Sequence, residues 1–307
     1  MLGEYYEFVG LALFVLLASL PAWPALFFLR GWVHACYDPA RRPAAGRRLM
    51  LAAALGGVVY LGAYIWGFHV EPNGPELSRI DLKGPFDPPL RILHVSDLHL
   101  EPDQSPRDQW VVDRARELAP DLILLTGDLN QVNSRDTVPL ANLLSQLKAP
   151  LGVFTCIGAD DVTSLEKAAP NVTILKNKAV TIKHGGKTIA LAGLYPSGPH
   201  APVYAEMAGA DYKIVLNHYP DCAEEAARHE ADLYLCGHTH GGQVRLPLWG
   251  AVYTYAATGK RFEAGRCQLG RTTVYTSRGI GMVPPPAPQV RFLCRPEMGL
   301  FTIGAAQ

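Results

Sequence analysis

Five short apolar runs of this chain are each followed closely by an aspartate or a histidine. Val, Ile and Leu dominate the runs and turn residues bound them, a pattern typical of buried strands. In layered α/β folds, ligands bind at the carboxyl ends of such strands. The chain is therefore expected to form an α/β fold with a polar site along one sheet edge. The runs with their polar residues are Arg91–Val95 with Asp97 and His99, Asp121–Leu125 with Asp128, Val153–Ile157 with Asp160 and Asp161, Lys213–Leu216 with His218, and Asp232–Leu235 with His238 and His240.

Helical segments alternate with these runs, and the middle of the domain is rich in predicted hairpins. Units of strand and helix followed by hairpins fit two sheets packed face to face, with helices outside. The predicted helices are Asp108–Leu118, Val138–Lys148, Thr163–Ala169 and Cys222–His229. The further predicted strands are Ser78–Lys83, Thr173–Leu175, Val180–Lys183, Thr188–Ala192, Thr273–Thr276 and Met298–Ile303.

The N-terminal part of the chain contains two uncharged segments, Phe8–Leu29 and Leu49–Phe68. Each has the ~20 residues needed to cross a bilayer, so residues 1–70 are predicted to form two transmembrane helices. A cleaved signal peptide is the alternative for the first segment, but Glu4 and Glu7 precede it and no basic residue does. A buried soluble hairpin is the alternative for the pair.

The loop between the two segments is strongly basic, with Asp38 as its one acid. By the positive-inside rule this loop is cytoplasmic. The proline- and glycine-rich stretch 71–89 is interpreted as a linker, and residues 90–307 as an extracytoplasmic domain. The chain as a whole has a formal net charge of +0 and its domain has no polybasic run, which argues against a nucleic-acid partner. The basic residues of the loop are Arg30, Arg41, Arg42, Arg47 and Arg48.

The polar residues after the strands have the chemistry of a divalent metal site. In an extended segment residues alternate faces, so Asp97 and His99 should point the same way, as should His238 and His240. Gly127 allows a sharp turn before Asp128, whose two carboxylate oxygens could bridge two cations. A pair of metals ~3.5–4 Å apart can activate water and hold phosphoryl oxygens. The predicted nucleophile is then hydroxide, and the predicted class a metal-dependent hydrolase.

A single histidine at a strand end is usually a surface or hydrogen-bonded residue, but the ordered set of motifs resembles a known family. Over residues 90 to 304 the chain is similar to the calcineurin-like metallophosphoesterases. The stretch Gly237–Pro247 is similar to their membrane-associated bacterial phosphodiesterase branch, which implies a bacterial-type cell membrane. The motifs are Asp97-Leu98-His99, Gly127-Asp128, Asn217-His218 and Gly237-His238-Thr239-His240-Gly241-Gly242-Gln243.

The resemblance implies a four-layer α/β/β/α sandwich with a dinuclear metal site. By resemblance one metal is held by Asp97, His99 and His240, and the other by His218 and His238, with Asp128 bridging them. Manganese, iron, zinc and magnesium are the ions that such sites commonly hold, and a mixed carboxylate and imidazole set does not choose among them.

The chain departs from the family pattern at Gly158-Ala159-Asp160-Asp161, where the family has Gly-Asn-His-Asp or Gly-Asn-His-Glu. Ala159 replaces the Asn that completes the second metal site, and Asp160 replaces the His that faces the substrate. Three hypotheses follow. Asp160 replaces the missing ligand, or the site holds one metal firmly, or the domain is a non-catalytic sensor of a phosphorylated ligand. Asp161 is interpreted as an N-cap, a role also open to Asp160.

The expected substrate is a phosphodiester or a pyrophosphate, either a small molecule or a lipid-linked one. Two apolar stretches, Leu246–Trp249 and Met282–Pro286, could form a rim that contacts the lipid bilayer. Packing within the domain is the alternative for both.

Overall fold

The computed structural model describes residues 44–101, 105–131, 137–158, 165, 169–195, 198–285 and 287–305. The chain divides into two compact units, Met1–Val70 and Glu71–Gln307. The described part of the first unit is helix α3 (Ala44–Ile65), followed by a π-helical turn at Trp66–Val70. None of the described helices has the combination of length and apolarity needed to cross a membrane. The first predicted span, Phe8–Leu29, lies outside the described residues.

The second unit contains two six-stranded sheets. The first has the order β1-β14-β2-β3-β4-β5, in which only the β14–β2 pair is antiparallel. Its strands are β1 (Glu76–Lys83), β2 (Leu90–Val95), β3 (Leu122–Leu125), β4 (Val153–Thr155), β5 (Val172–Ile174) and β14 (Glu297–Gly304). The segment 71–89, interpreted from the sequence as a linker with an edge strand, thus contributes β1.

The second sheet has the order β12-β13-β9-β8-β7-β6, with parallel pairing from β13 to β7 and antiparallel strands at both edges. Its strands are β6 (Lys178–His184), β7 (Lys187–Gly193), β8 (Tyr212–Leu216), β9 (Leu233–Cys236), β12 (Gly265–Leu269) and β13 (Thr272–Thr276). A separate two-stranded hairpin is formed by β10 (Arg245–Leu246) and β11 (Gly250–Ala251).

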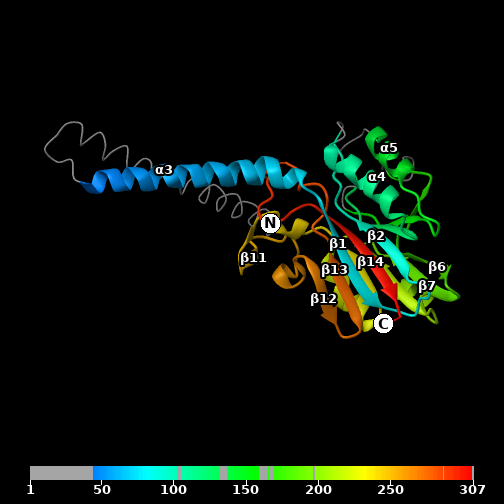
Figure 1. Ribbon diagram of the computed structural model, residues 1–307. Coiled ribbons are helices and arrows are strands. Elements are labelled where there is room, and N and C mark those ends of the chain that lie inside the picture. The colour runs from blue at the N-terminus through cyan, green and yellow to red at the C-terminus, as the bar shows by residue number, and fades with distance from the viewer. Residues whose placement is uncertain are drawn as a thin grey trace. The chain divides into compact units, whose positions relative to one another are not determined.

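Helices cover the outer faces of both sheets. The first sheet packs against α4 (Pro106–Leu118) and α5 (Val138–Gln146), which lie together on one side of it in Figure 1. The second packs against α7 (Ala201–Glu206) and α8 (Ala223–Arg228). Of the predicted helices, Thr163–Ala169 lies almost entirely outside the described residues.

A buried apolar cluster joins the two inner sheet faces. Ile92 and Leu124 come from the first sheet, and Ile214 and Leu235 from the second, and all four are fully buried. Burial of one such side chain contributes about 1.5–3 kcal/mol relative to exposure. Alternate residues, such as Leu93, face the helices instead. The order of layers is therefore helix, sheet, sheet, helix, as predicted.

Candidate metal centre

The six residues that the sequence marked as metal ligands come together at the carboxyl ends of four strands. Asp97 and His99 follow β2, and Asp128 follows β3, its parallel neighbour. His218 follows β8, while His238 and His240 follow the neighbouring β9. Five of the six residues are buried, and His238 is half-buried.

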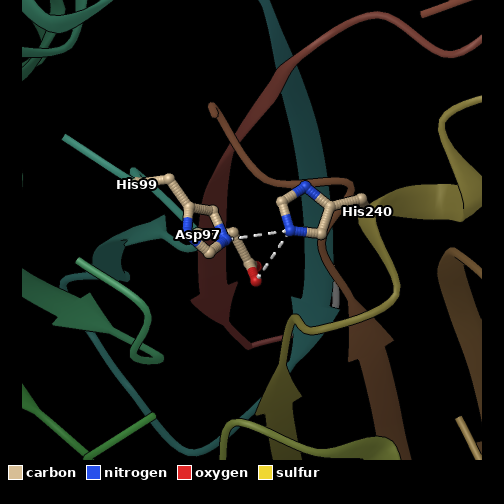
Figure 2. Close-up of side chains that lie close together, drawn as sticks. All are labelled: Asp97, His99 and His240. Carbon is tan, nitrogen blue, oxygen red and sulfur yellow. Dashed lines mark hydrogen bonds and ion pairs between the residues drawn. The ribbon is translucent and has the colours of Figure 1, made fainter. Parts of the chain in front are cut away.

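The first group of side chains consists of Asp97, His99 and His240, which Figure 2 shows converging on one point. The Nε2 atoms of His99 and His240 are 3.1 Å apart. His240 Nε2 lies 3.5 Å from Asp97 Oδ1. Two imidazole nitrogens and one carboxylate oxygen thus face a common centre.

The second group consists of Asp97, Asp128 and His218, with His238 beside it. His218 Nε2 lies 3.1 Å from Asp128 Oδ2 and 3.2 Å from His238 Nδ1. The same Oδ2 atom is 3.9 Å from His99 Nε2. The Asp128 carboxylate therefore lies between the two groups, and Asp97 belongs to both.

The protonation states of three of the four histidines fit a cation at this place. Burial lowers the pKa of His99 and of His238 to about 4, and that of His240 well below its ordinary value. These imidazoles are therefore neutral near pH 7. The Nε2 atoms of neutral His99 and His240 face each other, so at most one of the two can carry a proton. At least one Nε2 atom therefore directs a lone pair at the centre. Lone pairs of imidazole and carboxylate are the donors that divalent transition metals prefer.

The pKa values of two other groups, Asp97 and His218, are raised. Burial raises the pKa of the Asp97 carboxyl to about 6. Burial disfavours a charge on His218, but the charge and hydrogen bond of Asp128 outweigh it and raise the pKa of His218 to about 10. His218 Nδ1 donates to the carbonyl oxygen of Thr126 at 2.9 Å, which aims Nε2 into the centre.

The local backbone differs from the extended segments expected for the two motifs. Strand β2 ends at Val95 and β9 at Cys236, so the ligand residues lie in loops. The expectation that two-residue alternation aligns these side chains is wrong. The side chains converge because the backbone takes left-handed conformations, which occur in non-glycine residues mostly where the surroundings impose them. The φ angles are 50° at Asp97, 42° at His99, 49° at Asp128, 67° at His238 and 48° at His240.

Gly237 allows these loops to pack closely. A Cβ atom at this position would lie 2.0 Å from Ser96 Oγ and 2.1 Å from Asp97 Oδ2. The absence of a side chain also lets the His238 backbone N–H approach Asp97, to whose Oδ1 and Oδ2 it donates at 3.1 and 3.2 Å. The glycine of this motif is thus required for the position of the Asp97 carboxylate.

Several supporting residues were not predicted. Thr126 Oγ1 lies 2.8 Å from His94 Nε2 and donates to Ser96 Oγ at 2.7 Å, so a buried polar chain runs beneath the ligand loops. Arg291 is fully buried and donates to the carbonyl oxygens of Gly279 and Gly281. Ser96 and Thr126 precede predicted motifs directly, which is a sequence signal of their role, whereas Arg291 has none.

The residues of the altered motif, Ala159, Asp160 and Asp161, lie outside the described residues. Asn217 is buried, and its Oδ1 accepts from the backbone N–H of Tyr219 at 3.1 Å. A third group of possible ligands, which the sequence did not reveal, consists of His200, Cys222 and Glu225.

Comparison with known proteins assigns the chain to a family. The Calcineurin-like phosphoesterase family matches residues 90–242. The metallophosphoesterase YkuE of Bacillus subtilis is 31% identical over 273 residues, covering 82% of this chain and 93% of YkuE. The phosphodiesterase YaeI of Escherichia coli is 31% identical over 274 residues, covering 84% of this chain and 98% of YaeI. The UDP-2,3-diacylglucosamine pyrophosphatase LpxG of Chlamydia muridarum is 24% identical over 311 residues, covering 76% of this chain and 91% of LpxG.

The chain belongs to the calcineurin-like metallophosphoesterases. It is therefore a phosphoric ester hydrolase of a family that uses divalent metals, as the sequence motifs predicted.

Proposed function

We propose that this protein hydrolyses a phosphodiester or a pyrophosphate at the centre described above. Asp97, His99 and His240 would hold one divalent ion, and His218 and His238 a second, with Asp128 between them. The observation that carries the proposal is the position of Asp128 Oδ2, within 3.9 Å of His99 in one group and 3.1 Å of His218 in the other.

The protein's own residues prepare the site. When bound, a pair of divalent ions activates water and neutralises phosphoryl oxygens. Three neutral imidazoles, those of His99, His238 and His240, offer lone pairs without prior loss of a proton at pH 7. The His238 ring is further fixed because Nε2 contacts the carbonyl oxygen of Tyr255 at 3.2 Å. Little rearrangement is then needed to bind ions or substrate.

Hydrolysis of an aryl phosphodiester by the full chain with added Mn²⁺ tests the proposal. We expect turnover in the native chain and its loss, by at least about 100-fold, in Asp128→Asn, which keeps the shape of the side chain but removes its charge. Asp113→Asn is the matched control, because Asp113 is an exposed residue of α4. Turnover that survives in Asp128→Asn would refute the assignment of the site.

For Asp160 we propose that it completes the ligands of the second ion in place of the missing Asn. The competing hypotheses are a site with one firmly held ion and a sensor of a phosphorylated ligand, and the altered motif is the observation that favours them. The double change Ala159→Asn with Asp160→His separates these possibilities. It should leave activity unchanged or lower it if Asp160 is a ligand, and raise it if the native site is degenerate.

We further propose that the N-terminal region anchors the chain by two membrane spans, with the enzyme domain outside the cytoplasm. Two uncharged segments and the arginine-rich loop between them support this topology. Apolar side chains of α3 such as Leu55 and Val59 are also exposed, at 63% and 70%. A topology reporter fused after Gln307 should respond outside the cytoplasm, and a cytoplasmic response would overturn the proposal.

A lipid-linked phosphoester is the substrate class that we propose for such an anchored enzyme. The relative LpxG is named for a pyrophosphate substrate that carries acyl chains. Small soluble phosphodiesters are the alternative, and the relative rates on a soluble and a bilayer-embedded substrate decide between them.

A further inference from the structure

The β10–β11 hairpin exposes a cluster of large apolar side chains. Leu246 is 44% exposed, Leu248 110% and Trp249 66%. These fractions rule out the alternative that Leu246–Trp249 packs within the domain. The second apolar stretch differs, since Met282 and Val283 are only partly exposed and the Val283 N–H donates to Gln243 Oε1 at 2.6 Å.

The hairpin is connected directly to the loop that carries His240. Arg245 Nη1 donates to the carbonyl oxygen of Gly241 at 3.0 Å. The Arg245 N–H also donates to the carbonyl oxygen of Phe292 at 2.9 Å. The next residue, Leu293, is 49% exposed, and the thiol of Cys294 contacts the carbonyl oxygen of His240 at 3.3 Å. The exposed apolar residues therefore belong to segments that contact the backbone of His240 and Gly241 beside the metal centre.

Part of the backbone of the hairpin tip has hydrogen-bond partners. The Trp249 N–H donates to the carbonyl oxygen of Leu246 at 3.2 Å, and Pro247 has no N–H. Lys260 Nζ donates to the carbonyl oxygens of Trp249 and Ala251. These bonds reduce the number of unsatisfied polar groups that transfer of the tip to an apolar medium would create, and such groups are the main cost of that transfer.

Positive charge lies immediately behind the apolar tip. Lys260 Nζ is 4.7 Å from the centre of the Trp249 ring. Lys260 and Arg245 share a single carboxylate, Glu263, at 3.7 and 2.7 Å, so the three side chains carry a net charge of +1. The Lys260 side chain is 43% exposed and that of Glu263 only 17%, so the outward charge is positive. From the tip inward, the order is the apolar side chains, then the indole ring of Trp249, then the ammonium group of Lys260. In a bilayer the apolar interior is followed by the interface and then by the anionic headgroups, so the two orders match.

We propose that the tip Leu246–Trp249, with Leu293, docks on an anionic lipid surface and presents an amphiphilic phosphoester to the metal centre. The presentation of substrate rests on the proposed hydrolase function, whereas the docking does not. A second copy of the chain on this surface is the outcome that the test must exclude.

The first measurement is quenching of tryptophan fluorescence in the full chain reconstituted into vesicles of phosphatidylcholine and phosphatidylglycerol with brominated acyl chains. We expect the difference between native chain and Trp249→Phe to show a quenched contribution from Trp249, larger with phosphatidylglycerol present. A Trp249 contribution that brominated lipid leaves unquenched, as expected if a second copy covers it, would overturn the docking.

The second measurement compares two substrates, a soluble aryl phosphodiester and a fluorogenic phosphodiester lipid within the vesicles. The double change Leu248→Ser with Trp249→Ser should lower the rate on the lipid about tenfold or more, since two apolar anchors are lost. The rate on the soluble substrate should not change. Val138→Ser, at an exposed apolar position of α5, is the control and should affect neither.

The outcomes of the two proposals are distinguishable. If the native chain hydrolyses neither substrate, the hydrolase function fails while fluorescence quenching still reports on docking. If the native chain hydrolyses both substrates and the double variant equals it on both, the presentation of lipid by this hairpin is refuted.

Discussion

Asp97 has the most constrained position in the metal centre. Its carboxylate accepts the His238 N–H, belongs to both groups of candidate ligands and lies against Gly237. Its own backbone is held as well, since the Asp97 N–H donates to the carbonyl oxygen of Gly127 at 3.1 Å. Small displacements at this residue should therefore affect binding of both ions.

Gly237→Ala tests this constraint. The new methyl group would meet Ser96 Oγ and Asp97 Oδ2 at about half a normal contact distance, so one loop must move. We expect a loss of about 1–3 kcal/mol in the free energy of unfolding, the usual range for overpacking, together with weaker Mn²⁺ binding. Calorimetry of unfolding and of metal binding measures the two effects. Gly62→Ala, a helical position with no neighbour within 4 Å of the added carbon, should leave metal binding unchanged; equal binding in Gly237→Ala would contradict the account.

The sequence allowed six residues that meet at the centre to be chosen in advance, but it did not show how they meet, and Asp160 lies outside the described residues. Asp97 and His218 could be found because each follows an apolar run that forms a parallel strand, and the ends of adjacent parallel strands lie together. The left-handed backbone at Asp97 and His99 could not be found this way, since contacts with loops distant in sequence impose it. The role of Arg291 could not be predicted either. The carbonyl groups to which it donates belong to a loop whose conformation no local sequence pattern indicates.

At the scale of elements, a partly buried ion pair joins α7 to α8. His200, which precedes α7, lies with Nδ1 2.9 Å from Glu225 Oε2 in α8. Its Nε2 donates to the carbonyl oxygen of Tyr195 at 2.8 Å. Burial opposes the charge, but these two bonds and the charge of Glu225 raise the pKa of His200 above its ordinary value.

Glu225→Gln should therefore destabilise the protein in a pH-dependent manner. The folded state holds the His200 proton more tightly than the unfolded state, whose pKa is about 6.5. The stabilisation is complete below that value and disappears as pH rises through the raised pKa of the folded state. We expect a loss of about 1 kcal/mol at pH 6, typical of a hydrogen bond, and a smaller loss at pH 9, measured by urea unfolding. Glu224→Gln, which removes the exposed partner of Arg261, is the control; a loss independent of pH in Glu225→Gln would refute the ion pair.

Element prediction succeeded where the pattern is local. The predicted strands before Asp97, Asp128 and His218 agree with β2, β3 and β8 to within a few residues, because continuous apolar runs are a strong signal. The prediction did not place β14 between β1 and β2, since this pairing joins strands about 200 residues apart. It also missed α7 and β12, which are short and show no clear apolar periodicity.

At the scale of the whole molecule, bound metal should stabilise the fold. The site requires deprotonated ligands from both sheets, and these ligands are together only in the folded state, so binding favours folding. At a free metal concentration of 100 times the Kd, the expected gain is about 2.7 kcal/mol. Removal of metal with a chelator should lower the melting temperature of the full chain, and Mn²⁺ should restore it. The gain should shrink as the pH falls through about 6, where the Asp97 carboxyl takes up a proton and no longer binds metal well; a melting temperature unaffected by chelator would count against the site.

The number of Mn²⁺ ions bound per chain, determined by elemental analysis after equilibrium dialysis, shows whether these residues form a dinuclear metal centre. We expect about two ions for the native chain and for Asp113→Asn, and a clear loss in Asp128→Asn, since one carboxylate lies between both groups of ligands. A native chain that retains no metal, or an Asp128→Asn variant that binds as many ions as the native chain, would contradict this expectation.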